Sequence, residues 1–299
     1  MTHSRMRGVF TALVTPFREG GAVDEEAFVR LVDRQLEAGV HGLVPCGTTG
    51  EAPALEQEEW ERLVAVTVER AKGRVPVVAG TGTNNTALTI ARTRRARELG
   101  ADAALVVTPY YNKPNPAGLL AHYRAVAEEG GLPIVFYNVP SRTGLNATPE
   151  ILRPIAEIEL VRAVKEASGS LSQAHTLIKE RPGGVAVLSG EDELTCAMTL
   201  MGGDGVVSVV SNVDPAGTVR MVEAALAGDA EAARREHERL LDLMRALFAE
   251  TNPVPAKAAL AALGLCADAV RPPLAPASPA TRSRLEKALR AAGLLGPER

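Results

Sequence analysis

The chain repeats one pattern eight times: a short apolar, often β-branched run, then a segment with the apolar spacing of an amphipathic helix. The runs cover residues 9–14, 42–46, 75–79, 103–107, 133–137, 160–164, 185–188 and 205–210. Strands that alternate with helices form a parallel sheet covered by those helices. Eight such units are typical of a barrel. The pattern therefore predicts an α/β fold, a (β/α)8 TIM barrel, over residues 1–228.

A doubly wound open sheet is the competing arrangement. It would need fewer strands and would usually place a glycine-rich dinucleotide turn after the first one. The first turn here reads Thr15-Pro16-Phe17 and contains no GxGxxG motif. Aromatic residues make up only 3% of the chain, so the core is aliphatic, as parallel sheets prefer. Both observations favour the barrel.

After Gly228 the strand pattern stops and helical patterns take over. Residues 229–250 form one long amphipathic pattern, residues 252–263 a second, and Ser278 with Pro279 the cap and first residue of a third. We therefore expect a C-terminal helical domain of three helices over residues 229–299.

Composition excludes several kinds of partner. The net charge of −3 predicts no attraction to nucleic acid or to an anionic membrane surface. No stretch approaches ~20 apolar residues, and the N-terminus lacks a signal-peptide pattern. The three cysteines have no CxxC spacing and the five histidines no HxH or HExxH spacing. We expect a cytoplasmic protein without a metal or a cofactor.

Polar side chains follow most of the expected strands at their carboxyl ends. They belong to the segments 47–51, 108–112, 137–144, 165–166, 189–192 and 207–212. In a barrel these ends meet on one rim, which carries the active site. The sequence therefore predicts a polar site on that rim.

Lys165 is the one lysine of six that directly ends an apolar strand. An ammonium is costly to desolvate there, and the neutral amine can attack a keto group to form an imine. The alternative is a buried lysine paired with a carboxylate such as Glu166. Three of the four tyrosines also lie at strand ends, and Tyr137, Tyr111 and Thr49 could pass protons to such an imine. The alternative for each tyrosine is a packed ring with a satisfied hydroxyl.

Two further groups could hold carboxylates. The Arg142 guanidinium could form a bidentate pair with a substrate carboxylate, and Thr48 and Thr49 could bind a second one. The alternative for Arg142 is an arginine that braces its loop. The turn at Ser189-Gly190 could be a phosphate site, but a simple tight turn is favoured.

Together these motifs resemble the dihydrodipicolinate synthase family. The resemblance rests on GTTGE at 47–51, TPYYN at 108–112, YNVPSRTG at 137–144, KEASG at 165–169, SGED at 189–192 and GVVSV at 205–209. It extends to NPVPAK in the C-terminal region. It implies a lyase that condenses pyruvate with L-aspartate 4-semialdehyde in lysine and diaminopimelate biosynthesis, usually as a homotetramer.

The resemblance also implies roles for individual residues. Lys165 would form the pyruvate imine, and Tyr137, hydrogen-bonded to Thr49, would be the central acid and base. Tyr111 would complete the relay from the neighbouring subunit. The second substrate's carboxylate would bind Arg142. The remaining substrate-binding positions would be Thr48, Thr49, Gly190 and the main chain at Val207.

Lysine inhibition in this family uses a cleft at the dimer interface, lined in sensitive members by histidines and a glutamate. Gln57, Trp60 and Leu88 occupy those positions here. Because Leu88 cannot pair with an ammonium, we expect weak or absent inhibition by lysine.

Two other functions remain open at this point. One is another imine-forming pyruvate aldolase, acting on a sugar acid such as N-acetylneuraminate or a keto-deoxy-gluconate. The other is a binding protein on the same barrel without catalysis. Arg142 within NVPSRTG favours the synthase over the first, and the lysine, tyrosine and threonine set argues against the second.

Overall fold

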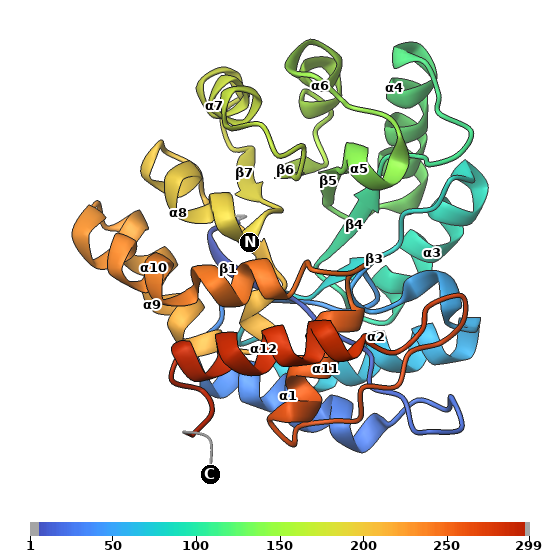
Figure 1. Cartoon of the computed structure of the whole chain (residues 1–299). Coiled ribbons are helices and arrows are strands. Elements are labelled where there is room, and N and C mark those ends of the chain that lie inside the picture. Colours follow the sequence, from blue (N-terminus) through green and yellow to red (C-terminus); the bar gives the residue numbers. More distant parts are fainter. Residues whose placement is uncertain (1–5, 297–299) are drawn as a thin grey trace.

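The computed structural model describes residues 6–296 of the chain, so residues 1–5 and 297–299 at the outer ends of the two expected domains lie outside it (Figure 1). Eight short strands form one parallel sheet. They are β1 (Gly8–Ala12), β2 (Gly42–Val44), β3 (Val78–Gly80), β4 (Ala103–Val107), β5 (Ile134–Asn138), β6 (Val161–Glu166), β7 (Ala186–Ser189) and β8 (Gly205–Ser208).

The sheet closes into a barrel. Each strand pairs with its neighbours in the order β2-β1-β8-β7-β6-β5-β4-β3, which is the order around a ring. A single parallel bridge between Leu43 and Val77 joins β2 to the chain before β3 and closes the ring. The predicted (β/α)8 barrel is therefore confirmed.

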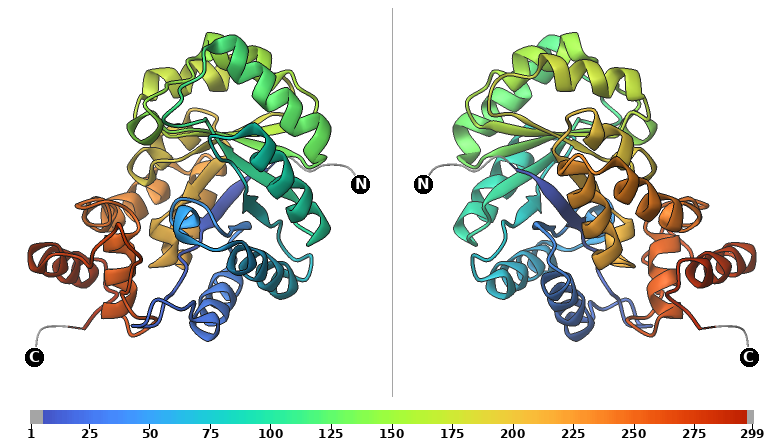
Figure 2. Two further views of the ribbon diagram at one scale, coloured as in Figure 1. Left: turned by 90° about the vertical axis from the view of Figure 1, so that its right-hand side faces the viewer. Right: turned by 90° about the vertical axis from the view of Figure 1, so that its left-hand side faces the viewer.

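Helices connect successive strands and cover the outside of the barrel (Figures 1 and 2). The helices around the barrel are α1 (Glu25–Glu37), α2 (Gln57–Ala71), α3 (Thr86–Glu98), α4 (Pro116–Ala125), α6 (Pro149–Ala156), α7 (Leu171–Glu180), α8 (Asp192–Leu200) and, after the last strand, α9 (Pro215–Leu226). Shorter turns are η1 (Ala52–Ala54), η2 (Val126–Gly130), α5 (Pro140–Thr143) and η3 (Val210–Asn212). Asp24 caps α1, because its side chain accepts a hydrogen bond from the Ala27 amide.

Some expected ends are wrong by a few residues. The third run was expected over residues 75–79, but β3 begins only at Val78; the eighth was expected to reach Val210, but β8 ends at Ser208. After β8 the chain continues as the short helix η3. Apolar runs extend past their strands because Val77, Val209 and Val210, which flank these strands, are buried as well.

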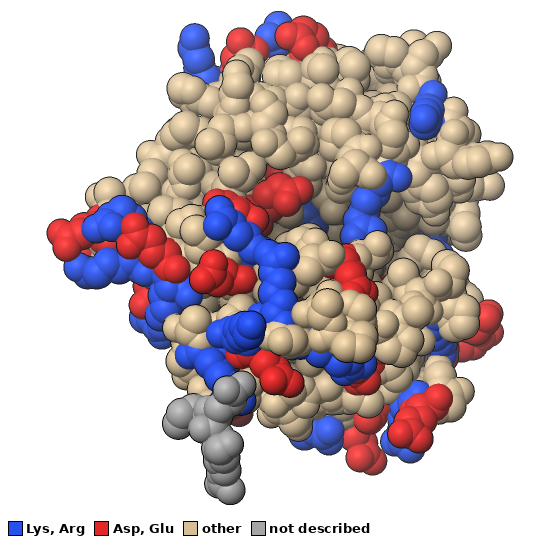
Figure 3. Space-filling model, viewed as in Figure 1, with Lys and Arg blue, Asp and Glu red and all other residues tan. Residues whose placement is uncertain are grey.

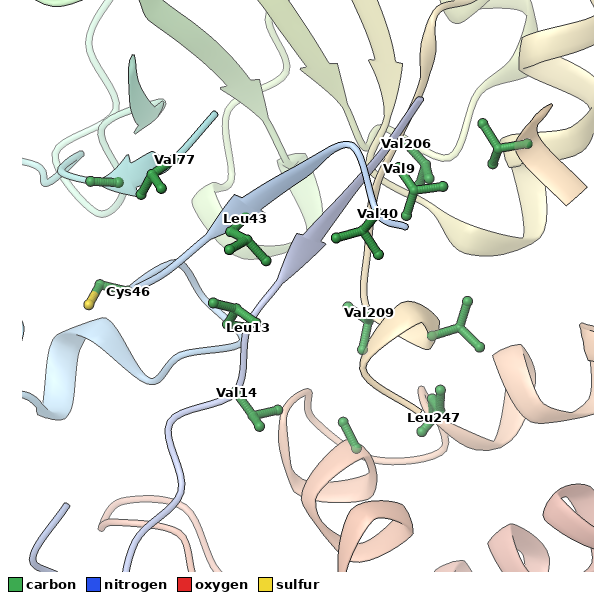
Figure 4. Packing of buried hydrophobic residues seen from close by; sticks show 14 of the residues in the cluster. Val9, Leu13, Val14, Val40, Leu43, Cys46, Val77, Val206, Val209 and Leu247 are labelled. Carbon is green, nitrogen blue, oxygen red and sulfur yellow. The ribbon is translucent and has the colours of Figure 1, made fainter. Parts of the chain in front are cut away.

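Alternate residues of each strand face two different cores. The smaller core fills the barrel with side chains such as Phe10, Val135, Ala163, Leu188 and Val207. The larger core lies between barrel and helices, as Figure 4 shows for Val9, Leu43 and Val206. This alternation decides which strand side chains reach the interior.

The C-terminal residues form the three expected helices, α10 (Ala230–Ala246), α11 (Val254–Ala262) and α12 (Pro279–Ala291). The larger core continues into them, so that Leu247 belongs to the same core as Val14 and Val209 (Figure 4). The domain boundary after residue 228 stays a prediction. No helix among residues 6–296 is both long and apolar enough to cross a membrane.

His122 on α4 makes stability sensitive to pH. Its Nδ1 lies 2.9 Å from the Thr86 hydroxyl, and burial lowers the pKa of the imidazole from 6.5 to about 4. The folded protein therefore binds this proton less readily than the unfolded chain. Its contribution to stability is constant above pH 6.5 and falls between pH 6.5 and about pH 4.

The loss from His122 alone should total about 3 kcal/mol across that interval. Urea unfolding at pH 7 and at pH 4.5 measures it. The variant His122→Gln, which cannot titrate, should lose less stability between the two pH values than the original protein. An identical loss in both proteins would contradict this assignment.

Candidate active site

Lys165 and Tyr137 face each other inside the top of the barrel. They are paired in the register of β5 and β6, and both are nearly buried, at 5% and 6% exposed. The Lys165 Nζ lies 4.1 Å from the centroid of the Tyr137 ring. The amine is therefore held against a phenol in a site with little solvent.

The alternative interpretation, Lys165 paired with Glu166, is wrong. Side chains alternate along a strand, so Glu166 points away from the barrel interior. Its carboxylate accepts hydrogen bonds from the Asn138 amide at 3.1 Å and from the Ser168 N–H at 2.8 Å. Among residues 6–296, Lys165 forms no ion pair, which leaves its nitrogen available to a ligand.

Gly190 and Val207, like Lys165, border the inside of the barrel. A Cβ at Gly190 would lie 3.1 Å from the Lys165 Cε and 2.6 Å from the Ala167 Cβ, so a side chain there would crowd the lysine. Val207 belongs to β8 and to the core inside the barrel. Gly190 therefore borders the lysine side chain, and Val207 lies in the barrel interior; their binding of substrate stays a prediction.

Acidic residues of α8 and its cap border the site. The buried Asp192 carboxylate accepts hydrogen bonds from the main-chain N–H groups of Val209, at 3.0 Å, and Val210, at 2.9 Å, and so fixes the chain after β8. Burial, followed by the charge of Asp192, raises the pKa of Glu191, whereas Lys165 and Arg142 oppose that rise. Glu191 is thus an acid within electrostatic range of both cationic groups, and the sequence reasoning gave it no role.

Thr48 and Thr49 follow β2 in a tight loop. Thr48 lines the cavity described below, and Thr49 is buried. The Thr49 hydroxyl accepts a hydrogen bond of 3.0 Å from the Asn252 side-chain amide. The expected hydrogen bond between Thr49 and Tyr137 is not among the hydrogen bonds of residues 6–296. Because the hydroxyl accepts from Asn252, its own proton remains free for another acceptor.

Residues of the C-terminal region contact the loop that carries Thr48 and Thr49. Glu51, in a left-handed conformation with φ of 53°, pairs with Lys257 of α11 at 2.6 Å between Oε1 and Nζ. Its second oxygen accepts from the Arg271 N–H at 3.0 Å. Lys257 is fully buried and also lies over the Phe17 ring. The loop with Thr48 and Thr49 therefore depends on residues about two hundred positions away in the chain.

Arg142 lies at the mouth of the site on α5. One amino group donates a 3.2 Å hydrogen bond to the Asn252 main-chain oxygen, and the side chain lines a cavity of about 230 Å³. Thr48 and Tyr137 line the same cavity. Asn252 thus contacts both expected carboxylate-binding regions, the threonines and the arginine.

Tyr111 is not brought to this cluster within one chain. Its side chain is 90% exposed and its backbone is left-handed, with φ of 70°. Such a conformation is uncommon for a residue other than glycine. Neighbouring Asn112 is tied to the Asn84 main-chain oxygen at 2.8 Å, so the loop holds the ring outward.

The positions expected to govern lysine inhibition differ in their environment. Leu88 is 42% exposed, and the exposed Gln57 bonds to Glu61 of its own helix. Trp60 is fully buried and donates its indole N–H to the Gly80 oxygen at 2.9 Å. Trp60 is therefore part of the core.

Asn252 is the contact that sequence reasoning missed, although it begins the NPVPAK motif. We expect Asn252→Asp to lower kcat about tenfold or more, because a carboxylate would accept a hydrogen bond from the Thr49 hydroxyl instead of donating one to it. KM for pyruvate should change less, since the imine-forming amine is untouched. Steady-state kinetics measures both.

A matched control is Asn115→Asp. Asn115 accepts from the Gly118 N–H as the cap of α4, and an aspartate caps a helix equally well. This variant should keep the original kcat. A kcat for Asn252→Asp equal to that of Asn115→Asp would show that Asn252 does not position Thr49 for catalysis.

Comparison with known proteins agrees with this geometry. Residues 5–292 match the model of the dihydrodipicolinate synthetase family. A 4-hydroxy-tetrahydrodipicolinate synthase from Thermomicrobium roseum is 55% identical over 284 residues, which cover 95% of this chain and 94% of the relative.

Two solved structures are also similar. The dihydrodipicolinate synthase from Thermotoga maritima has a TM-score of 0.95 and 44% identity, covering 98% of this chain and all of the other. The chloride-inhibited enzyme from Acinetobacter baumannii, complexed with pyruvate, has a TM-score of 0.95 and 39% identity, covering 97% of this chain and 100% of the other.

Fold and site together define a (β/α)8-barrel protein with a lysine-centred site at the carboxyl ends of its strands. The chain belongs to the dihydrodipicolinate synthetase family.

Proposed function

We propose that the protein is a lyase that condenses pyruvate with L-aspartate 4-semialdehyde through an imine at Lys165, as a 4-hydroxy-tetrahydrodipicolinate synthase. The observation that carries this proposal is the buried Lys165 amine held 4.1 Å from the Tyr137 ring. Family membership over nearly the whole chain supports it.

In the first step the neutral Lys165 nitrogen attacks the C2 carbonyl of pyruvate and forms a carbinolamine. A proton is delivered to the departing hydroxyl, water leaves, and the imine forms. The proposed acid for this transfer is Tyr137, whose ring centroid lies 4.1 Å from the Lys165 Nζ. The Thr49 hydroxyl, supported by Asn252, is a candidate to pass protons on to it. Thr48, Gly190 and the Val207 main chain would surround the bound pyruvate.

In the second step the imine loses a proton from C3 and becomes an enamine, which attacks the aldehyde carbon of the second substrate. The proposed partner of that substrate's carboxylate is Arg142, whose guanidinium lines the cavity. The amino group of the same substrate can then displace the Lys165 nitrogen, which closes a ring and frees the enzyme.

Turnover with different aldehydes tests this function. With pyruvate present, aspartate semialdehyde should be consumed, while N-acetylneuraminate and keto-deoxy-gluconate should not be cleaved. Cleavage of either sugar acid at a higher kcat/KM would favour the other aldolase class. The relatives compared above are synthases and give no support to that alternative.

We further propose that Tyr111 contacts the active site of a second copy, within a homotetramer built from two such dimers. The Tyr111 side chain is 90% exposed and its backbone has a left-handed conformation, so the ring is accessible to another molecule. Tyr111→Phe should lower kcat about tenfold or more while the association state, measured by ultracentrifugation, stays the same. A fully active Tyr111→Phe would contradict the relay.

The remaining proposals concern context. We propose that the reaction takes place in the cytoplasm and feeds lysine and diaminopimelate synthesis. Weak inhibition by lysine also stays a prediction, consistent with the exposed Leu88 and the buried Trp60.

A further inference from the structure

The cavity above the barrel extends beyond the residues used so far. Its wall also includes Cys46, Ala52, Pro53, Arg92 and Tyr110. The residues with ionic charge at neutral pH that line it are two arginines, Arg92 and Arg142, and no carboxylate lines it. The space next to the proposed substrate site is therefore positively charged.

Arg92 has no partner for its charge. Its Nε is buried without a hydrogen bond, and neither terminal amino group has a hydrogen bond or an ion pair among residues 6–296. Its neighbours on α3 are different: Arg94 pairs with Glu129 at 3.1 Å and Arg95 with Glu61 at 2.7 Å. Buried polar groups are normally satisfied, so the unpaired Nε of this half-buried arginine beside a cavity indicates an anionic ligand.

The thiol in the same wall does not supply that anion. Cys46 lies close enough for the Arg92 charge to act on it, but burial raises the pKa of the thiol far more than Arg92 lowers it. The thiol is therefore neutral at physiological pH. The other residues beside Arg92 in the wall, such as Ala52 and Pro53, carry no charge.

We propose that Arg92 binds a carboxylate of a small dicarboxylic acid in this cavity. A guanidinium offers its N–H groups in a planar fork that matches a carboxylate in two hydrogen bonds. With Arg142 on the same wall, a second carboxylate also has a cationic partner. At about 230 Å³ the cavity is smaller than the pockets of roughly 300–1,000 Å³ that hold drug-sized ligands, so its size suits a short organic acid.

Occupation of this site would obstruct the cavity through which Thr48 and Tyr137 are reached. On the proposed function, the acid would therefore inhibit by competing with the second substrate. Figure 3 shows a hollow in the middle of the drawn face with basic side chains in it, beside acidic ones.

Calorimetric titration of the full-length protein tests the proposal. Lys165 is first blocked by reduction of its pyruvate imine with borohydride, and malonate, succinate and glutarate are then added in turn. At least one should bind with one site per chain, and neutral succinamide should not. Arg92→Gln should weaken the binding about tenfold or more, and Arg92→Lys should weaken it less.

Arg94→Gln is the matched control, because Arg94 lies on the same helix but is exposed and paired. It should bind the acids as the original protein does. The proposal is overturned if none of the three acids binds, as would happen if a carboxylate of the partner subunit already paired with Arg92. It is also overturned if Arg92→Gln binds the acids unchanged. Failure to form the reduced adduct would count against the imine instead, and the titration would then use unmodified protein.

Discussion

Replacement of Lys257 by methionine is expected to lower the free energy of unfolding by about 3–5 kcal/mol. Lys257 is fully buried, and its ammonium lies 2.6 Å from the Glu51 carboxylate. Burial lowers the pKa of Lys257, while the charge of Glu51 opposes that shift. Methionine fills similar space but leaves the Glu51 charge buried without its partner, which is the costly outcome for a buried pair.

Denaturant unfolding of three variants measures this effect. The double variant Glu51→Gln with Lys257→Met should recover a large part of the lost stability, because no unpaired charge remains. Lys287→Met, on the exposed side of α12, should stay within about 0.5 kcal/mol of the original protein. If Lys257→Met is as stable as Lys287→Met, the pair does not anchor the C-terminal helices to the loop after β2.

Replacement of Lys165 by arginine is expected to lower kcat/KM by at least about 10³-fold, the scale seen when a nucleophile is lost. Arginine keeps a positive charge at this position but is never neutral in a protein, so it cannot form an imine. A purely electrostatic role for Lys165 would tolerate this change.

Lys179→Arg on the exposed end of α7 is the control, with an unchanged kcat/KM expected. Thermal unfolding of both variants shows whether they remain folded. A Lys165→Arg protein within tenfold of the original activity would contradict the imine chemistry.

The barrel could be predicted because its signal is local and repeated. Each strand and helix leaves its own apolar spacing in the sequence, and eight repeats compensate for uncertain ends. The ends themselves depend on tertiary contacts. Residues 75–77 are apolar, but Val75 lies in a bend and β3 begins at Val78, because only one bridge, through Val77, joins β2 to this part of the chain.

The lysine and its tyrosine could be predicted for a related reason. Tyr137 and Lys165 end neighbouring strands and face inward by alternation, so their encounter follows from register. The same alternation excludes Glu166 as the partner of Lys165, which strand position alone did not decide.

The long-range contacts that position the site residues could not be predicted in this way. Asn252 and Lys257 reach Thr49 and Glu51 across more than two hundred residues, and no local pattern records such a contact. Lys257 in the sequence looks like one more helical lysine. Arg92 likewise differs from Arg94 only in what surrounds it. Long-range polar contacts of this kind require the folded structure.

The most direct test of the central claim is mass spectrometry of the original protein after incubation with pyruvate and borohydride. The account predicts one reduced pyruvate adduct per chain, on the peptide that contains Lys165, and none without pyruvate. Lys165→Arg should give no adduct, whereas Lys179→Arg should give the full amount. An adduct on another lysine, or none at all, would contradict the account.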